Sequence, residues 1–253
     1  MEKTIKNIDK TVAKKIATGI NGLDEMLLGG IPVGNQILIA GGPGAGKTLL
    51  SLEILYHNAK NGIPSSFIAF EETSDQLIIN FKNAFPEFKD IDDLIKNKMI
   101  IIANQGPSTR STEEGSDTNL YVFGNIILDI ENTILSNNSK LVVIDSVSLL
   151  KLTMRNKTDY RRAMVLLISN MRRLNTTTLL TLELPSSERK DLKFTSEFFI
   201  FDGVIILYQI GQEEKRLLSM EIIKMRGTNH SLVFSPYEIT SNGFKVFTMG
   251  GEF

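Results

Sequence analysis

The chain has 253 residues, of which 42% are hydrophobic and 23% charged, and these ordinary proportions exclude extended disorder. Its formal net charge of -1 excludes a molecule-wide positive field for nucleic acid or an anionic membrane. The sequence has no cysteine for disulfides or thiolate metal sites, and two isolated histidines, His57 and His230, argue against a zinc site. No secretory signal and no apolar run of roughly 18 residues is found, so we expect a cytoplasmic protein without membrane contact.

Apolar runs typical of buried strands alternate with helical patterns through most of the chain. A segment to about residue 15 has no clear periodicity, and we expect it to be loosely ordered. The patterns then predict strands at 36–40, 65–70, 99–103, 141–145 and 176–183, and helices at 49–59, 75–84, 120–135 and 164–174. A polar loop with Gly106, Pro107 and Gly115 follows the third strand.

The alternation of strands and helices predicts an α/β fold, with a mainly parallel sheet covered by helices on both faces. After Gly203, apolar runs follow one another without helical segments, which predicts a C-terminal antiparallel extension. Because no linker divides the chain, we expect residues 1–253 to form a single domain.

The segment GGPGAGKT, residues 41–48, fits the phosphate-loop pattern G-x-x-x-x-G-K-[ST], between a predicted strand and a predicted helix. Glycines let successive backbone N–H groups curl around phosphate oxygens, and the helix N-terminus adds the positive end of its dipole. We expect Lys47 to contact the β- and γ-phosphates of a nucleotide and the Thr48 hydroxyl to ligate Mg²⁺. The alternative is a glycine-rich turn with no ligand. The expected nucleotide-binding residues are Gly42, Pro43, Gly44, Ala45, Gly46, Lys47, Thr48 and Leu49.

Acidic residues end three predicted strands, at the edge where parallel sheets bind ligands. Asp145 has the form of a Walker B aspartate that holds Mg²⁺, and the alternative is a helix cap or turn acid. Glu71 and Glu72 are placed to activate a water molecule, or they are solvated acids. Because neighbouring strand residues point to opposite sides, we expect only Glu71 to face that water. Glu183 is a weaker candidate for sensing the γ-phosphate or bonding neighbouring loops.

The chain resembles the KaiC-like ATPases of the RecA/RadA superfamily from about Thr18 to Phe247. The resemblance is carried by TGINGLDEMLLGGIPVGNQILIAGGPGAGKT, FEET, LVVIDSVS, DYRRAMVLLISNMRRL, DGVIILYQ and KMRGTNH. It implies a RecA-type P-loop core, ATP with Mg²⁺, and a ring of identical subunits, usually six, with ATP between them. It also implies catalytic roles for Glu71 and Glu72.

By the same resemblance, Lys224 and Arg226 match basic residues that the family extends into the neighbouring subunit's ATP site, and His230 matches the end of that motif. Two-domain members of the family are phosphorylated on a Ser-Thr pair, where this chain has Phe198 and Phe199, so we do not expect such phosphorylation. Leu184 stands where the family often has arginine, which weakens a sensing role for Glu183.

The strand pattern RLLSMEIIKMR predicts that Lys224 and Arg226 project from one face and Met225 from the other. The motif is far in sequence from its own phosphate loop, so a neighbour's ATP is the expected target, with Gly227 as a bend after the strand. A cation delivered in this way accelerates hydrolysis about 10³- to 10⁵-fold. The alternative is a solvated pair on an edge strand that blocks aggregation.

Two basic loops indicate a further alternative, DNA binding, which we do not favour because aromatic residues for stacking are sparse. Their cations are Lys151, Arg155, Lys157, Arg189, Lys190 and Lys193. We therefore expect a slow Mg²⁺-dependent regulatory or timing ATPase that contacts copies of itself and other regulatory proteins. The alternatives are an ATP-binding switch with negligible hydrolysis and a recombinase-related DNA-binding ATPase.

Overall fold

The computed structural model describes residues 14–105, 118–152, 154, 156–186, 188–191, 196–211 and 217–248. The expected polar loop, with Gly106, Pro107 and Gly115, and the cations Arg155 and Lys193 lie outside these ranges, as do residues 1–13. The elements are β1 (Lys15–Ile16), α1 (Leu23–Met26), β2 (Ile31–Pro32), β3 (Gln36–Gly41), α2 (Lys47–Lys60), β4 (Ser65–Ala69), α3 (Ser74–Ala84), α4 (Ile91–Lys96), β5 (Ile100–Asn104), α5 (Thr118–Asn137), β6 (Leu141–Asp145), α6 (Val147–Leu152), α7 (Lys157–Arg173), β7 (Thr177–Glu183), β8 (Gly203–Ile210), β9 (Leu217–Met225), β10 (Ser235–Thr240) and β11 (Gly243–Val246), with short 3₁₀ turns at Arg189–Asp191 and Ser196–Phe199.

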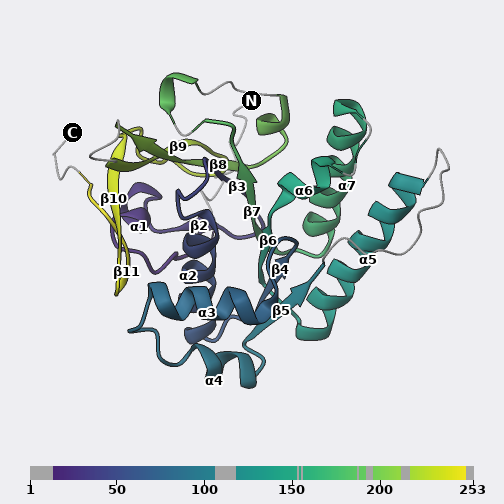
Figure 1. The fold of residues 1–253 in the computed structure, drawn as a ribbon, viewed down its shortest axis with the longest axis horizontal. Coiled ribbons are helices and arrows are strands. Elements are labelled where there is room, and N and C mark those ends of the chain that lie inside the picture. The colour runs from purple at the N-terminus through teal and green to yellow at the C-terminus, as the bar shows by residue number, and fades with distance from the viewer. Residues whose placement is uncertain are drawn as a thin grey trace, which may run out of the picture.

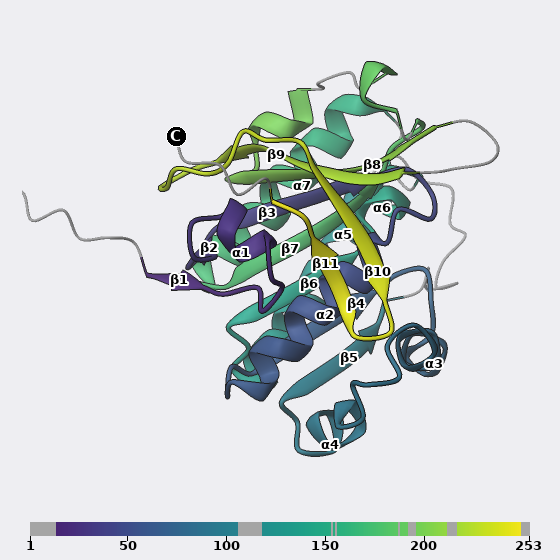
Figure 2. The same cartoon turned by 90° about the vertical axis from the view of Figure 1, so that its left-hand side faces the viewer.

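A nine-stranded sheet forms the centre of the molecule, in the order β11-β10-β9-β8-β3-β7-β6-β4-β5 (Figures 1 and 2). The strands from β8 to β5 in this order are parallel, and β9, β10 and β11 continue the sheet as antiparallel neighbours. The expected mainly parallel sheet with a C-terminal antiparallel extension is therefore confirmed. The extension starts one strand later than expected, because β8 is parallel to β3 and only its pairing with β9 is antiparallel.

Helices cover both faces of this sheet, as expected (Figure 1). One apolar core packs α2, α3 and α4 against the sheet, with Leu52, Phe81 and Ile91 among its fully buried side chains. A second core packs α5, α6 and α7 against the other face. Continuous apolar runs such as β3 and β6 suit this arrangement, because a strand covered on both faces needs no polar side.

Helices α2, α3 and α5 begin within two residues of the predicted starts, whereas α7 begins at Lys157, seven residues before position 164, and α4 and α6 were not predicted. Helix α3 begins after Thr73, whose side chain accepts a hydrogen bond from the Gln76 N–H at 3.3 Å. Helix α2 begins at Lys47, two residues before the expected start, because the phosphate loop itself leads into its first turn. None of the helices in the described ranges combines the length and apolar character needed to cross a bilayer.

The N-terminal part of the described chain is ordered more firmly than we expected for the segment to Lys15. Lys15 lies in β1 and pairs with Pro32 of β2. Its Nζ donates hydrogen bonds to the carbonyl oxygens of Leu27 at 2.9 Å and Leu28 at 2.8 Å. Lys15, at the end of the segment expected to be loosely ordered, is thus held by carbonyl groups at the end of α1, and the expectation stays a prediction for residues 1–13, which lie outside the described ranges.

The carboxyl ends and the amino ends of the parallel strands, called the carboxyl edge and the amino edge of the sheet, carry different parts of the predicted site. At the carboxyl edge, Gly41 of β3 pairs with Glu183 of β7, and Ala69 of β4 pairs with Asp145 of β6. At the amino edge, Ile37 near the start of β3 pairs with Gly203 of β8. The strands therefore gather the phosphate loop and the acids at one edge and leave the opposite edge for other residues.

Candidate functional site

The phosphate loop connects β3 to α2 with two glycines in the left-handed region, Gly44 at φ +73° and Gly46 at φ +88°. A Cβ atom on Gly46 would lie 2.8 Å from Cδ1 of Ile239 and 2.9 Å from Cζ of Phe244, so this position has no room for a side chain. Gly46 is also the N-cap of α2 and offers no side-chain cap. The N–H groups of the first turn therefore have no side-chain acceptor at the cap, an arrangement that suits an anion.

Lys47 lies half-buried at the start of α2, and its Nζ donates a 2.9 Å hydrogen bond to the Gly42 carbonyl. Burial lowers the pKa of Lys47, while the carboxylates of Glu183, Asp145 and Glu71 act in the opposite direction. The amine thus faces three acids at the carboxyl edge of the sheet. Leu49 follows in the same turn and packs against the first core.

Asp145 is the buried acid of this site and is held by two hydroxyl groups. Thr48 Oγ1 donates to Oδ2 of Asp145 at 2.9 Å, and Thr181 Oγ1 donates to Oδ1. Burial raises the pKa of Asp145, and both hydrogen bonds act to lower it. A buried carboxylate beside a threonine hydroxyl fits Mg²⁺, which binds through one or two carboxylates together with substrate phosphates and water.

The described residues contain no group of three or more acidic or histidine side chains that could hold a metal by themselves. Mg²⁺ bound here would therefore take most of its oxygen ligands from phosphate and water, with Thr48 and Asp145 as the protein side. Thr181 was not anticipated from the sequence. A threonine between leucines near the end of the strand was the available signal, but its position opposite Asp145 depends on how β6 and β7 align.

Glu71 and Glu72 follow β4, and their side chains point to different partners, as adjacent residues should. Glu71 Oε1 accepts a hydrogen bond from Ser146 Oγ at 2.6 Å, which keeps it beside Asp145. Glu72 Oε2 accepts from Asn80 Nδ2 on α3 at 3.0 Å. Of the two exposed acids, only Glu71 thus bonds to the segment that carries the buried aspartate. Ser146 is a second residue that the sequence interpretation did not single out.

Glu183 and Leu184 lie beside the start of the phosphate loop. The Glu183 N–H donates to Ser148 Oγ at 2.8 Å, and the Leu184 N–H donates to the Gly41 carbonyl at 2.9 Å. A backbone contact does not require arginine at position 184, so Leu184 still supports the loop. The Glu183 side chain is exposed, and its negative charge opposes the lowering of the Lys47 pKa by burial.

Lys224 and Arg226 lie at the amino edge, on the far side of the sheet from the phosphate loop. Gly203 of β8 pairs with Met225, and the same Gly203 pairs with Ile37 of β3. The six residues of β3 therefore separate Arg226 from its own loop by about 20 Å. A strand of this length keeps the two cations away from the nucleotide that their own loop would bind.

Both cations contact the same neighbouring segment, which agrees with the prediction that they share one face. Lys224 Nζ donates to the Phe198 carbonyl at 3.1 Å, and Arg226 donates to the Phe199 carbonyl at 3.3 Å. Arg226 Nη1 also lies 3.4 Å from Oδ1 of Asp202. Burial and the charge of Arg226 lower the pKa of Lys224. Strand β10 pairs with β9 only at Ser219 and Met220, so in the described pairings the end of β9 that carries Lys224 has β8 as its one strand neighbour, and the edge-strand alternative stays open.

Gly227 and His230 complete the basic motif just after β9. Gly227 has φ +83°, so the chain bends there, as expected, directly after Arg226. His230 Nδ1 shares a 2.9 Å hydrogen bond with the Ser231 carbonyl, and the Ser231 N–H donates to the Met26 carbonyl at 2.7 Å. These contacts hold the motif against the end of α1.

Two of the candidate DNA-binding cations that the structure describes are paired with acids. Arg189 Nη2 lies 2.8 Å from Oε1 of Glu221, and Lys190 Nζ lies 2.6 Å from Oε2 of Glu188. Pairing with a carboxylate reduces the charge that each cation presents to a phosphate. DNA binding stays an unfavoured prediction.

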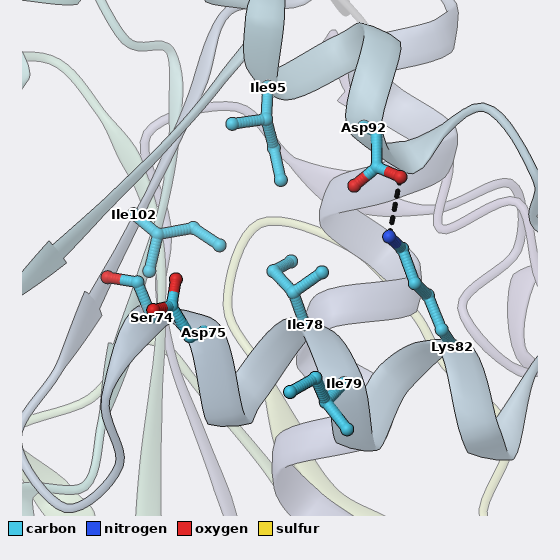
Figure 3. Close-up of a pocket in the computed structure, with 8 residues that line it drawn as sticks. All are labelled: Ser74, Asp75, Ile78, Ile79, Lys82, Asp92, Ile95 and Ile102. Atoms are coloured by element: carbon cyan, nitrogen blue, oxygen red, sulfur yellow. Dashed lines mark hydrogen bonds and ion pairs between the residues drawn. The ribbon is translucent and has the colours of Figure 1, made fainter.

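A groove of about 550 Å³ lies between α3, α4 and β5, away from the phosphate loop (Figure 3). Ile78, Ile95 and Ile102 point into it from these three elements, and Lys82 forms an ion pair with Asp92 at its rim. None of the site residues predicted from the sequence lines this groove.

Comparison with known proteins places this arrangement in a family. The family model described as "ATPase: KaiC" matches residues 16–250. The chain belongs to the KaiC ATPase family. The circadian clock oscillator protein KaiC of Picosynechococcus is 33% identical over 238 residues, which cover 94% of this chain and 45% of that protein. KaiC 1 of Synechocystis is 30% identical over 98% of this chain and 47% of its own length. The chain thus spans less than half the length of these curated relatives.

Membership in the KaiC family confirms the expected RecA-type ATPase domain. It agrees with the strand order, the phosphate loop after β3 and the acid at the end of β6.

Proposed function

We propose that this chain is a slow Mg²⁺-dependent ATPase that works between copies of itself in a ring. The observation that carries the proposal is the hydrogen bond of 2.9 Å from Thr48 to Asp145 beside Lys47. It brings the phosphate-binding loop and a buried metal-binding acid together within one subunit. The basic motif lies at the opposite ends of the parallel strands, so within one subunit the phosphate loop and the basic motif do not meet at the same nucleotide.

The residues at the carboxyl edge take separate tasks in this proposal. The backbone N–H groups of residues 42–49, apart from Pro43, which has none, bind the phosphates together with the Lys47 amine, and Thr48 and Asp145 supply the protein ligands of Mg²⁺. Bound Mg²⁺ neutralises charge on the phosphates. Glu71 orients the attacking water and accepts its proton, and its bond to Ser146 holds it near Asp145. Glu72, bonded to Asn80, supports α3 instead.

Lys224 and Arg226 act on the ATP of the adjacent subunit in this proposal, with Gly227 and His230 shaping the turn that presents them. The support is their position about 20 Å from their own loop, judged from the six residues of β3. Contacts between unlike edges of identical subunits are heterologous and close into a ring when the rotation permits. Positive charge near the γ-phosphate stabilises the negative charge of the transition state.

Apolar side chains around the basic motif fit a subunit contact at this edge. Phe199, which accepts a hydrogen bond from Arg226 through its carbonyl, has a side chain that is 67% exposed. Leu232 is 80% exposed and Leu28 is 59% exposed, and the bond from Ser231 to Met26 places their segments side by side. Exposed apolar groups that gather near functional cations favour a protein partner. A second copy of this chain, bringing its phosphate loop, is that partner here.

The biological role that we propose is regulatory, in which hydrolysis times contacts with other proteins. Relatives named circadian clock oscillator proteins support a role of this kind. The chain spans less than half of their length, so the role is proposed for this ATPase domain and not copied from the whole relatives. We place this work in the cytoplasm.

Sizing the protein with and without Mg-ATP, together with a phosphate-release assay, tests the proposal. We expect a particle of about six subunits with Mg-ATP, and slow phosphate release that stops when Mg²⁺ is chelated. Binding of ATP without release above the uncatalysed rate would favour the switch alternative. Release that DNA stimulates, with a steep loss at higher salt, would favour the recombinase-related alternative. A monomer that neither binds nor hydrolyses ATP would overturn the proposal.

A further inference from the structure

The phosphate loop has carbonyl groups at every second residue, Gly41, Pro43 and Ala45, that accept hydrogen bonds from three different parts of the fold. The Gly41 carbonyl accepts from the Leu184 N–H at 2.9 Å, after β7. The Pro43 carbonyl accepts from Gln209 Nε2 of β8 at 3.0 Å, and the Ala45 carbonyl accepts from Tyr237 Oη of β10 at 2.6 Å. The backbone contact at Gly41 is available to any sequence, whereas the other two depend on particular side chains.

The planarity of the peptide bond gives these contacts a consequence for the N–H groups. In a trans peptide the carbonyl of one residue and the N–H of the next point in opposite directions. Fixing the carbonyls of Pro43 and Ala45 therefore fixes the direction of the Gly44 and Gly46 N–H groups. A phosphate loop binds its anion through such N–H groups, and glycine offers no side chain to restrain them.

Buried packing holds Tyr237 in the position from which its hydroxyl donates to the Ala45 carbonyl. Its side chain is 2% exposed and stacks on Phe244 of the same hairpin, with ring centroids 5.6 Å apart. Burial raises the pKa of the Tyr237 hydroxyl, which stays protonated and able to donate. Phe244 and Ile239 also fill the space against which a Cβ of Gly46 would press. The hairpin of β10 and β11 thus supports the loop from behind through both packing and a hydrogen bond.

The hairpin is itself anchored to the helix that follows the loop. Glu53 of α2 is 2% exposed, and its two carboxylate oxygens accept the Phe244 N–H at 2.9 Å and 3.2 Å. A Cβ on Gly243 would lie 2.2 Å from Oε1 of Glu53, so the turn fits tightly over this carboxylate. The distance between Tyr237 and the start of α2 is therefore set by buried contacts on both sides.

We propose that Tyr237 is a positioning residue for the nucleotide, which holds the Ala45 carbonyl so that the Gly46 N–H stays aimed at the phosphates. Gln209 does the same for Pro43 and Gly44 from the half-buried part of β8. Without the hydroxyl, the Ala45 carbonyl is left unsatisfied among buried groups and turns to find water, and the Gly46 N–H turns with it. This inference rests on the proposed nucleotide-binding function.

Tyr237→Phe is the decisive variant, because it removes the hydroxyl and keeps the ring. We expect the Kd for Mg-ADP, measured by titration of the intact protein, to rise about 3- to 10-fold, the value of one hydrogen bond. We also expect faster hydrogen exchange at the backbone amides of residues 41, 42 and 44–48 in the absence of nucleotide. Gln209→Met should change both readouts in the same direction and replaces Tyr237→Phe if that variant does not fold.

Tyr208→Phe is the matched control, because Tyr208 is also buried and its hydroxyl donates to Oε2 of Glu221 at 3.2 Å. Removal of the Tyr208 hydroxyl should leave the Kd for Mg-ADP and the hydrogen exchange of the phosphate-loop amides unchanged. The inference is overturned if wild-type protein binds Mg-ADP and Tyr237→Phe binds it equally well. It is also overturned if Tyr208→Phe weakens binding as much as Tyr237→Phe does. If the wild-type protein binds no nucleotide, the proposed function itself fails, and this inference fails with it.

Discussion

The hydroxyl of Thr48 donates a 2.9 Å hydrogen bond to Oδ2 of Asp145, although 97 residues separate them in the sequence. The contact exists because β3 and β6 flank β7 as parallel strands and end at the same edge of the sheet. Asp145 is buried there with Thr181 on its other oxygen, so its position is fixed before any ion arrives. Preorganised ligands lower the cost of capturing Mg²⁺.

Thr48→Val should remove most of the gain in ATP affinity that Mg²⁺ provides, because it replaces the hydroxyl by a methyl group of similar size. We expect a loss of about 10-fold or more in Mg²⁺-dependent affinity. Nucleotide titrations with Mg²⁺ and with EDTA measure that gain. Thr48→Ser keeps the hydroxyl and should retain it. An equal response to Mg²⁺ in Thr48→Val and wild type would contradict the metal role.

Glu71→Gln should slow hydrolysis by about 10²- to 10⁴-fold while ATP binding is retained, because the amide cannot accept the proton of the attacking water. Glu72→Gln is the matched control on the adjacent residue, whose carboxylate instead accepts from Asn80 on α3. It should keep most of the activity. Single-turnover phosphate release on saturated protein separates the two. The assignment to Glu71 fails if Glu72→Gln is the more damaging change.

Mixing Lys47→Ala with Arg226→Ala should restore hydrolysis that neither variant has alone. A mixed contact contains one intact phosphate loop and one intact Arg226, provided that Arg226 acts on the neighbour. Arg226→Ala should fold, because Oδ1 of Asp202 keeps its 2.9 Å bond to Arg172. Phosphate release is measured after subunit exchange has been demonstrated with labelled protein. No recovery under those conditions would rule out action between subunits.

Glu53→Gln should change how stability depends on pH. Burial raises the pKa of Glu53, against the opposing effects of His57 and the Phe244 N–H, so the folded protein holds this proton more tightly than the unfolded chain. The free energy of unfolding of the wild type therefore falls as pH rises from the usual value of 4.5 through the raised one. Gln does not titrate, and its oxygen still accepts the Phe244 N–H.

The expected result is a difference in the free energy of unfolding between Glu53→Gln and wild type that grows in favour of the variant as pH rises through this window. Urea unfolding at a series of pH values measures it. Glu53→Ala provides the contrast, since it leaves the Phe244 N–H without its acceptor and should destabilise the protein by about 1 to 3 kcal/mol. A difference that stays constant with pH would show that Glu53 does not titrate in this window.

The sequence was sufficient to predict the parallel sheet, the phosphate loop and the acids at the strand ends. These features depend on local patterns, such as the apolar run of 36–40 before the glycines and the run LVVID before Asp145. The separation of the two glutamates also followed from local geometry. In each case the signal lies within a few residues of the feature that it predicts.

The hydrogen bonds that support the site residues could not be predicted from local sequence patterns. Thr181 meets Asp145 only because of the register of β6 and β7, and Tyr237 reaches Ala45 across 192 residues of sequence. The bond from Ser146 to Glu71 spans 75 residues. Hydroxyl groups of this kind are common in any chain, so their importance appears only when tertiary structure sets them against a carbonyl or a carboxylate.

The separation of Lys47 and Arg226 on opposite edges of one sheet has a consequence for counting. If each complete site needs the loop of one subunit and the arginine of the next, an open row always has one loop and one arginine left over at its ends. An isolated subunit would then have no complete ATP site, an open pair would have one, and only a closed ring would have one complete site for each subunit. The hydrolysis rate per subunit would therefore be lower in open assemblies than in closed rings.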